Sequence, residues 1–154
     1  MKKSILICLL FLLISIGIFV CSLWKYNNKK TFDKPLFDKN AMEGIPTVNS
    51  DLGYELLNPE GLYSVSLCGN PIIKDNKLKI YLTSSPENDI YIKARIYKND
   101  KLVGESGLIK PNEYIEYINV KNIKSGDTIN VKVMGYEKNS YYSAGVINID
   151  LIVG

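Results

Sequence analysis

The sequence predicts an all-β fold, an antiparallel sandwich of about seven strands, preceded by one N-terminal transmembrane helix. Three observations support this prediction: an uncharged apolar run opens the 154-residue chain, apolar and polar residues alternate in its second half, and turn-forming residues separate the alternating stretches. No helical period appears after the apolar run. About seven short strands in about 95 residues are typical of an immunoglobulin-like sandwich.

The first element is the apolar run over residues 4–24, which contains no charged residue. About 20 apolar residues can cross a bilayer as a helix, whereas the apolar part of a signal peptide is about 7–15 residues long. We therefore expect an uncleaved signal-anchor over residues 1–24. Two alternatives stay open. Cleavage after Ser22 would release a secreted domain, and Cys21 could be lipidated, although Val20 replaces the small residue that a lipobox has there.

The orientation of this anchor is predicted from the lysines around it, which are Lys2, Lys3, Lys25, Lys29 and Lys30. The three lysines after the run would place the domain in the cytoplasm by the positive-inside rule. Against this, two lysines followed at once by an apolar run are the layout of export signals. We expect a single-pass protein of the cell membrane with an extracytoplasmic domain, and a cytoplasm-facing membrane regulator remains an alternative.

After the anchor, residues 25–57 lack a sustained period and contain scattered prolines, glycines and charges. We predict a spacer here that lifts the domain from the membrane. The alternative is an extension that packs on the domain through four apolar side chains, Leu36, Phe37, Ile45 and Val48. The β-sandwich domain is predicted over residues 58–154.

The predicted strands of this domain alternate apolar residues, facing inward, with polar ones. The clearest inward sets lie in Leu78–Leu82, Ile90–Ile96, Ile129–Val133 and Ile147–Val153. Three further strands are expected near Tyr63–Leu67, Leu102–Ser106 and Tyr114–Val120. Turn formers such as the Lys-Ser-Gly-Asp stretch at 124–127 separate them.

Two segments carry a resemblance. Residues 104–118 read GESGLIKPNEYIEYI, and residues 136–153 combine a tyrosine-bearing loop with a final LIV strand. Both are similar to segments of small membrane-anchored Ig-like proteins of Gram-positive bacteria, which are mostly uncharacterised. Asn112 stands where those proteins have glycine, and we expect the turn to survive because asparagine tolerates positive φ. The resemblance implies the fold and a membrane location, and it implies no catalytic residue.

The residue types offer little catalytic chemistry, so we predict no enzyme activity, no cofactor and no metal site. The chain has no histidine, its three cysteines lack zinc-site spacing, and no glycine-rich phosphate loop is present. Cys68 has no visible activating partner and is expected to be a packed small residue. Glu113 and Glu116 are expected to be solvated. A cell-wall carbohydrate-acting accessory enzyme stays an alternative that needs a deep pocket lined by both glutamates.

The candidate interaction surface consists of Tyr136, Tyr141, Tyr142, Tyr81, Tyr91, Tyr97 and Arg95. Exposed tyrosine and arginine are enriched at interface hot spots, although ordinary cross-strand pairing also explains such residues. From residue 31 onward, 14 basic residues stand against 16 acidic ones, a balance of −2 that argues against nucleic-acid binding. We expect a binding or scaffolding module of a bacterial surface, secretion or conjugation assembly, whose partner is another surface or membrane protein.

Overall fold

The computed structural model describes Leu12, residues 14–22 and residues 33–154, and the chain divides into two units, 1–33 and 34–154. In the first unit, Leu12 and residues 14–22 are helical and exposed. Over all the residues described, none of the helices combines the length and the apolar character needed to cross a membrane. The rest of the predicted anchor over residues 1–24 lies outside the described residues.

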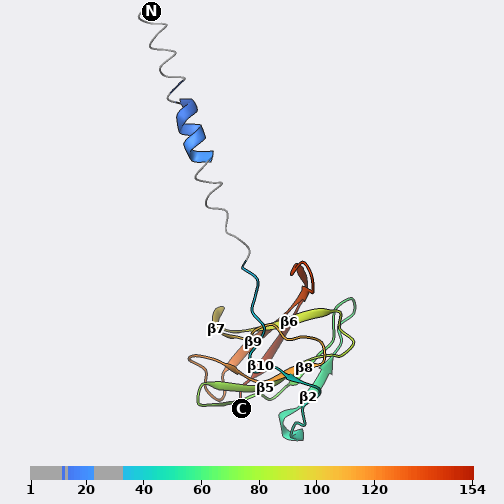
Figure 1. Ribbon diagram of the computed structural model, residues 1–154. Helices are drawn as coiled ribbons and strands as arrows, with labels where there is room; N and C mark the ends of the chain where they lie inside the picture. Colours follow the sequence, from blue (N-terminus) through green and yellow to red (C-terminus); the bar gives the residue numbers. More distant parts are fainter. Residues whose placement is uncertain (1–11, 13, 23–32) are drawn as a thin grey trace, which may run out of the picture. The chain divides into compact units, whose positions relative to one another are not determined.

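The second unit is built from two antiparallel sheets, which confirms the predicted all-β, sandwich-like class (Figure 1). The larger sheet has the order β1–β8–β5–β3–β2, and β4 also pairs with β5. Its strands are β1 (Met42–Glu43), β2 (Tyr54–Leu57), β3 (Val65–Cys68), β4 (Ile72–Lys74), β5 (Lys77–Ser84) and β8 (Glu113–Asn119). A short 3-10 helix, η1 (Ser50–Leu52), precedes β2.

The smaller sheet has the order β10–β9–β6–β7. Its strands are β6 (Ile90–Lys98), β7 (Lys101–Glu105), β9 (Thr128–Glu137) and β10 (Ser143–Ile152). Along the chain, β5 and β6 are neighbours, yet β5 pairs with β8 and β6 pairs with β9. The central strand pairs of the two sheets are therefore interleaved in sequence, and their inner faces share one hydrophobic core.

The alternating pattern is the reason that the long strands form where they were predicted. Ile92, Ala94 and Ile96 of β6 are fully buried, as are Val131 and Val133 of β9. Because successive strand residues point to opposite faces, their polar neighbours lie on the outer face. The predicted number of about seven strands is too low. The three missed strands, β1, β2 and β4, span two to four residues each, too few to display a period.

The prediction that residues 25–57 form a free spacer does not describe residues 34–57, which belong to the folded unit. Both backbone pairing and apolar contacts hold this segment on the domain. The Phe37 ring packs edge-on against Tyr91 at 5.0 Å, and Pro46 is buried. Phe37 forms a parallel bridge with Leu108, and a carboxylate oxygen of Asp38 accepts a hydrogen bond from the Gly107 nitrogen at 2.7 Å. Leu36, in contrast, is 80% exposed.

Residues 104–118, one of the two segments from which the resemblance was inferred, are shaped by this pairing. A Cβ on Gly107 would lie 2.5 Å from the backbone of Asp38, so the close approach of the two chains requires glycine. Asn112 has φ = +62°, as expected for the turn before β8. Backbone geometry thus explains two positions of this segment, Gly107 and Asn112.

Candidate functional site

Cys68, the only cysteine of the predicted domain, is fully buried at the end of β3. Burial raises the pKa of its thiol to about 11, and the opposing charge of Lys79 does not compensate. At neutral pH the group is therefore a protonated thiol, which is a poor nucleophile.

The two glutamates are engaged separately. One carboxylate oxygen of Glu113 accepts a hydrogen bond from the Lys110 backbone nitrogen at 3.0 Å, within the turn before β8. The other carboxylate oxygen lies 3.3 Å from the Lys110 ammonium nitrogen. Glu116 forms an ion pair with Lys79 at 2.9 Å. Hydrogen bonding to Lys79 lowers the pKa of Glu116 despite partial burial. Each carboxylate thus has its own basic partner.

Of the predicted surface residues, Tyr81 lies apart from the rest, on β5 of the larger sheet. It occupies a β-bulge, where the register between β5 and β8 shifts, and its φ is +50°. Its hydroxyl donates a hydrogen bond to Glu116 at 3.2 Å. Left-handed backbone is unusual for tyrosine and marks a locally strained position.

The smaller sheet carries four of the predicted residues, which are Tyr91, Arg95, Tyr97 and Tyr136. The first three alternate along β6 between buried residues, and Tyr136 lies directly opposite Tyr91 on β9. Their shared parity places them on the outer face of the sheet. The β9–β10 hairpin then adds Tyr141 and Tyr142 beyond Tyr136.

We call Tyr91, Tyr136, Tyr141 and Tyr142 the tyrosine patch. The ring centroids of Tyr91 and Tyr141 are 6.1 Å apart, and Phe37 packs edge-on against Tyr91 at 5.0 Å. Tyr141 itself has φ = +57°, and its nitrogen donates to the Glu137 carbonyl at 3.0 Å. Tyr142 is 73% exposed. One tyrosine of the loop therefore packs and the next one projects.

Between the patch and the far end of this face, Arg95 is held in place by charge pairing. Lys93 and Arg95 both contact the same carboxylate oxygen of Glu105, at 3.0 and 3.2 Å. Burial alone would raise the pKa of Glu105, but the two basic side chains outweigh it and keep that pKa below its usual value. Arg95 is thus a member of a three-residue ion network.

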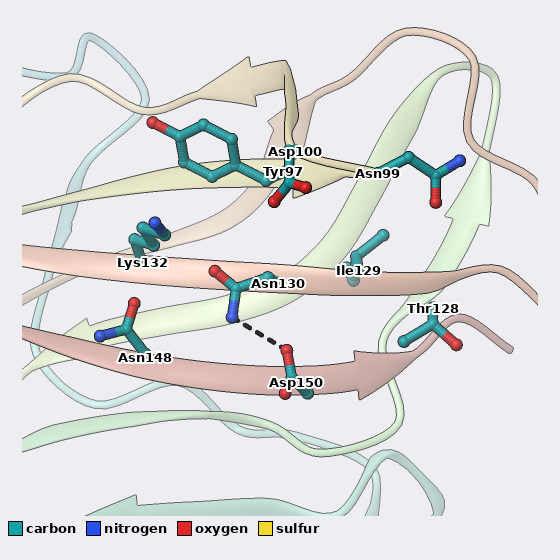
Figure 2. Close-up of a pocket in the computed structure, with 9 residues that line it drawn as sticks. All are labelled: Tyr97, Asn99, Asp100, Thr128, Ile129, Asn130, Lys132, Asn148 and Asp150. Atoms are coloured by element: carbon teal, nitrogen blue, oxygen red, sulfur yellow. Dashed lines mark hydrogen bonds between the residues drawn. The ribbon is translucent and has the colours of Figure 1, made fainter.

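At the other end of the outer face lies a hollow of about 510 Å³, which we call the polar hollow (Figure 2). It is lined by Tyr97, Asn99, Asp100, Thr128, Ile129, Asn130, Lys132, Asn148 and Asp150. These residues come from the β6–β7 turn and from strands β6, β9 and β10. The lining contains three carboxamides, two carboxylates, one ammonium group and one aromatic ring.

The centre of the polar hollow is Asn130. Its Nδ2 donates a hydrogen bond to Oδ1 of Asp150 at 2.9 Å, whereas its Oδ1 is buried and has no partner in the part of the chain that the structure describes. Figure 2 shows the amide nitrogen directed at Asp150 and the oxygen on the opposite side. The ammonium nitrogen of Lys132 lies 4.9 Å from the centroid of the Tyr97 ring.

Sequence reasoning identified only Tyr97 of this hollow. The alternation indicated that Asn130 and Lys132 point outward, but not that they face Asp150 and Asn148 across the sheet, because register between strands is a tertiary property. Among residues 12, 14–22 and 33–154, no group of three or more acidic, cysteine or histidine residues is placed to hold a metal ion. Comparisons with protein-family models, with curated proteins and with solved structures find no match to this chain.

Proposed function

We propose that the chain is a membrane-tethered, non-catalytic binding or scaffolding module whose tyrosine patch docks another surface or membrane protein. The observation that carries this proposal is the contrast within the β9–β10 loop. Tyr142 is 73% exposed, while the neighbouring Tyr141 is packed against Tyr91. A large aromatic side chain held by an ordered base contributes contact area at low entropy cost, which is how interface anchors gain affinity.

The remaining parts of the proposal rest on the fold and the sequence. Interleaved pairing of β5 with β8 and of β6 with β9 supports an immunoglobulin-like arrangement, a fold that often carries binding surfaces. The uncharged run over residues 4–24 supports a single-pass anchor. The domain would then act on the extracytoplasmic side of the membrane, within a bacterial surface, secretion or conjugation assembly.

Site-specific photo-crosslinking in the native membrane tests the docking surface. A photoreactive phenylalanine analogue replaces Tyr142 in one full-length variant and Leu56 in another. Leu56 is a matched control because it is 63% exposed but lies on β2 of the larger sheet. We expect one crosslinked product of discrete mass from position 142, containing a membrane or surface protein, and none from position 56. Equal products from both positions, or none from either, would contradict the proposal.

A further inference from the structure

We propose that the polar hollow is a saccharide-binding site that accepts neutral or amino-bearing sugars and rejects anionic ones. This inference is independent of the tyrosine patch, since it uses the opposite end of the outer face and shares none of the patch residues. It also assigns a ligand class to residues that the proposed docking surface leaves unused.

The size of the hollow is that of a small-molecule site. Its volume of about 510 Å³ lies within the range of about 300–1,000 Å³ that is usual for ligand pockets. It sits on the face of a sheet, where the backbone groups of β9 are already paired with β6 and β10. A peptide recognised through its backbone needs a free strand edge, and in this sheet such an edge lies along the outer side of β10, not on the face where the hollow is. Recognition in the hollow therefore depends on side chains.

The orphaned oxygen of Asn130 indicates what the ligand must bring. The hydrogen bond from Nδ2 to Asp150 fixes the orientation of the amide, so Oδ1 cannot exchange places with the nitrogen. A buried acceptor without a partner is unfavourable, and a donor that reaches it gains a hydrogen bond. A sugar hydroxyl is such a donor. Tyr97 of β6 lies opposite Asn130 of β9 in the register. Lys132 follows Asn130 by two residues on β9.

The Asn130 oxygen is buried, so the proposed site also requires a side chain to move. The long, flexible side chain that lines the hollow beside it is that of Lys132. Its ammonium nitrogen rests 4.9 Å from the Tyr97 ring centroid. When this side chain swings away, the Tyr97 ring is free to stack against the C–H face of a sugar, and the Asn130 oxygen becomes reachable. An amino sugar would restore the lost cation–π contact with its own ammonium group.

The polarity and charge of the lining narrow the ligand class. An apolar ligand would remove water from the carboxamides and carboxylates without replacing the hydrogen bonds, which is costly. A sugar replaces them, because its hydroxyls both donate and accept. Asp100 and Asp150 together outweigh Lys132 by one negative charge, so uronates and phosphates are repelled and ammonium groups are attracted.

Calorimetric titration of the full-length chain tests the proposal, in a detergent that has no sugar headgroup. The probes are a glucosamine tetramer, cellotetraose, tetragalacturonate and a neutral Ser-Gly octapeptide. We expect the glucosamine tetramer to bind most tightly, cellotetraose less tightly, and the uronate not at all. Absence of binding by both favoured sugars up to about 10 mM, or tighter binding of the uronate or of the peptide, would overturn the assignment.

Variants locate the binding. Tyr97→Ala is expected to weaken binding of the glucosamine tetramer at least about tenfold. Tyr117→Ala is the matched control and should leave binding unchanged, because Tyr117 carries the equivalent contact from Lys77, at 4.4 Å, on the larger sheet. Asp150→Asn retains the size of the side chain but removes its charge. It should weaken binding of the glucosamine tetramer more than binding of cellotetraose. Equal loss in the Tyr97 and Tyr117 variants, or an unaltered sugar preference in Asp150→Asn, would contradict the site.

Discussion

The hydroxyl of Tyr63 donates a hydrogen bond to the carbonyl oxygen of Val133 at 2.7 Å, joining positions 70 residues apart. It also lies 3.1 Å from the carbonyl oxygen of Gly145, at the bulge of the β9–β10 hairpin. The ring occupies the space where a side chain on Gly135 would otherwise lie. This buried tyrosine therefore secures the hairpin that presents the tyrosine patch.

Tyr63→Phe is expected to lower the free energy of unfolding by about 1–3 kcal/mol, because the Val133 carbonyl loses a buried hydrogen bond while the ring still fills its site. Urea unfolding followed by fluorescence measures the change. Tyr142→Phe is the control and should have no effect, since its side chain is 73% exposed. A destabilisation of equal size in both variants would show that the buried hydroxyl has no special role.

The same residue predicts a dependence of stability on alkaline pH. Burial raises the pKa of Tyr63 above its ordinary value of 10.0, and hydrogen bonding to the backbone does not offset this. A raised pKa means that the folded state holds the proton more tightly, so its stabilising contribution is complete below pH 10 and declines above it. The free energy of unfolding, measured between about pH 9 and pH 11, should therefore fall more steeply with pH in the wild type than in Tyr63→Phe. Parallel curves would contradict this.

Substitution of the two tyrosines of the hairpin loop, Tyr141 and Tyr142, should have different effects on the free energy of unfolding. Tyr141→Ala removes a ring that packs on Tyr91 and lies beneath Lys34, whose nitrogen is 4.5 Å from its centroid. We expect a loss of about 1–2 kcal/mol, seen as a lower melting temperature. Tyr142→Ala should change the free energy of unfolding by less than about 0.5 kcal/mol. The opposite order would assign the packing role to Tyr142.

Gly107→Ala should detach the segment around Asp38 from the domain, because the added Cβ would lie 2.5 Å from the Asp38 backbone. Hydrogen exchange measures this directly: the amide of Asp38, which donates to the Leu108 carbonyl at 2.8 Å, should lose its protection. Gly69→Ala is the control, since its Cβ would meet only the Gly53 carbonyl at 3.3 Å. Retained protection of Asp38 in Gly107→Ala would refute the close approach.

The thiol of Cys68 should resist alkylation at neutral pH in the folded protein. The residue is fully buried, and burial raises its pKa to about 11. Iodoacetamide labelling followed by peptide mass analysis should detect modification at Cys68 only after denaturant is added. Cys21, which is exposed in the first unit, gives a comparison in detergent. Rapid labelling of native Cys68 would indicate an accessible, reactive thiol instead.

The sequence by itself determined the long strands and the class of the fold. Ile92, Ala94 and Ile96 all became buried because a period of two in the chain is converted directly into two faces of a strand. The same rule indicated that Tyr91, Arg95 and Tyr97 face outward. These properties depend only on neighbours along the chain.

Tertiary structure decided what side-chain periodicity does not encode. The pairing of Phe37 with Leu108 uses backbone hydrogen bonds, which leave no apolar pattern to detect. The polar hollow arises because Asn130 of β9 faces Tyr97 on one side and Asp150 on the other. That arrangement is set by the register between strands that are far apart in sequence. In the sequence alone, each of these polar residues therefore resembles an ordinary exposed strand residue. Only the folded sheet brings them together into one site.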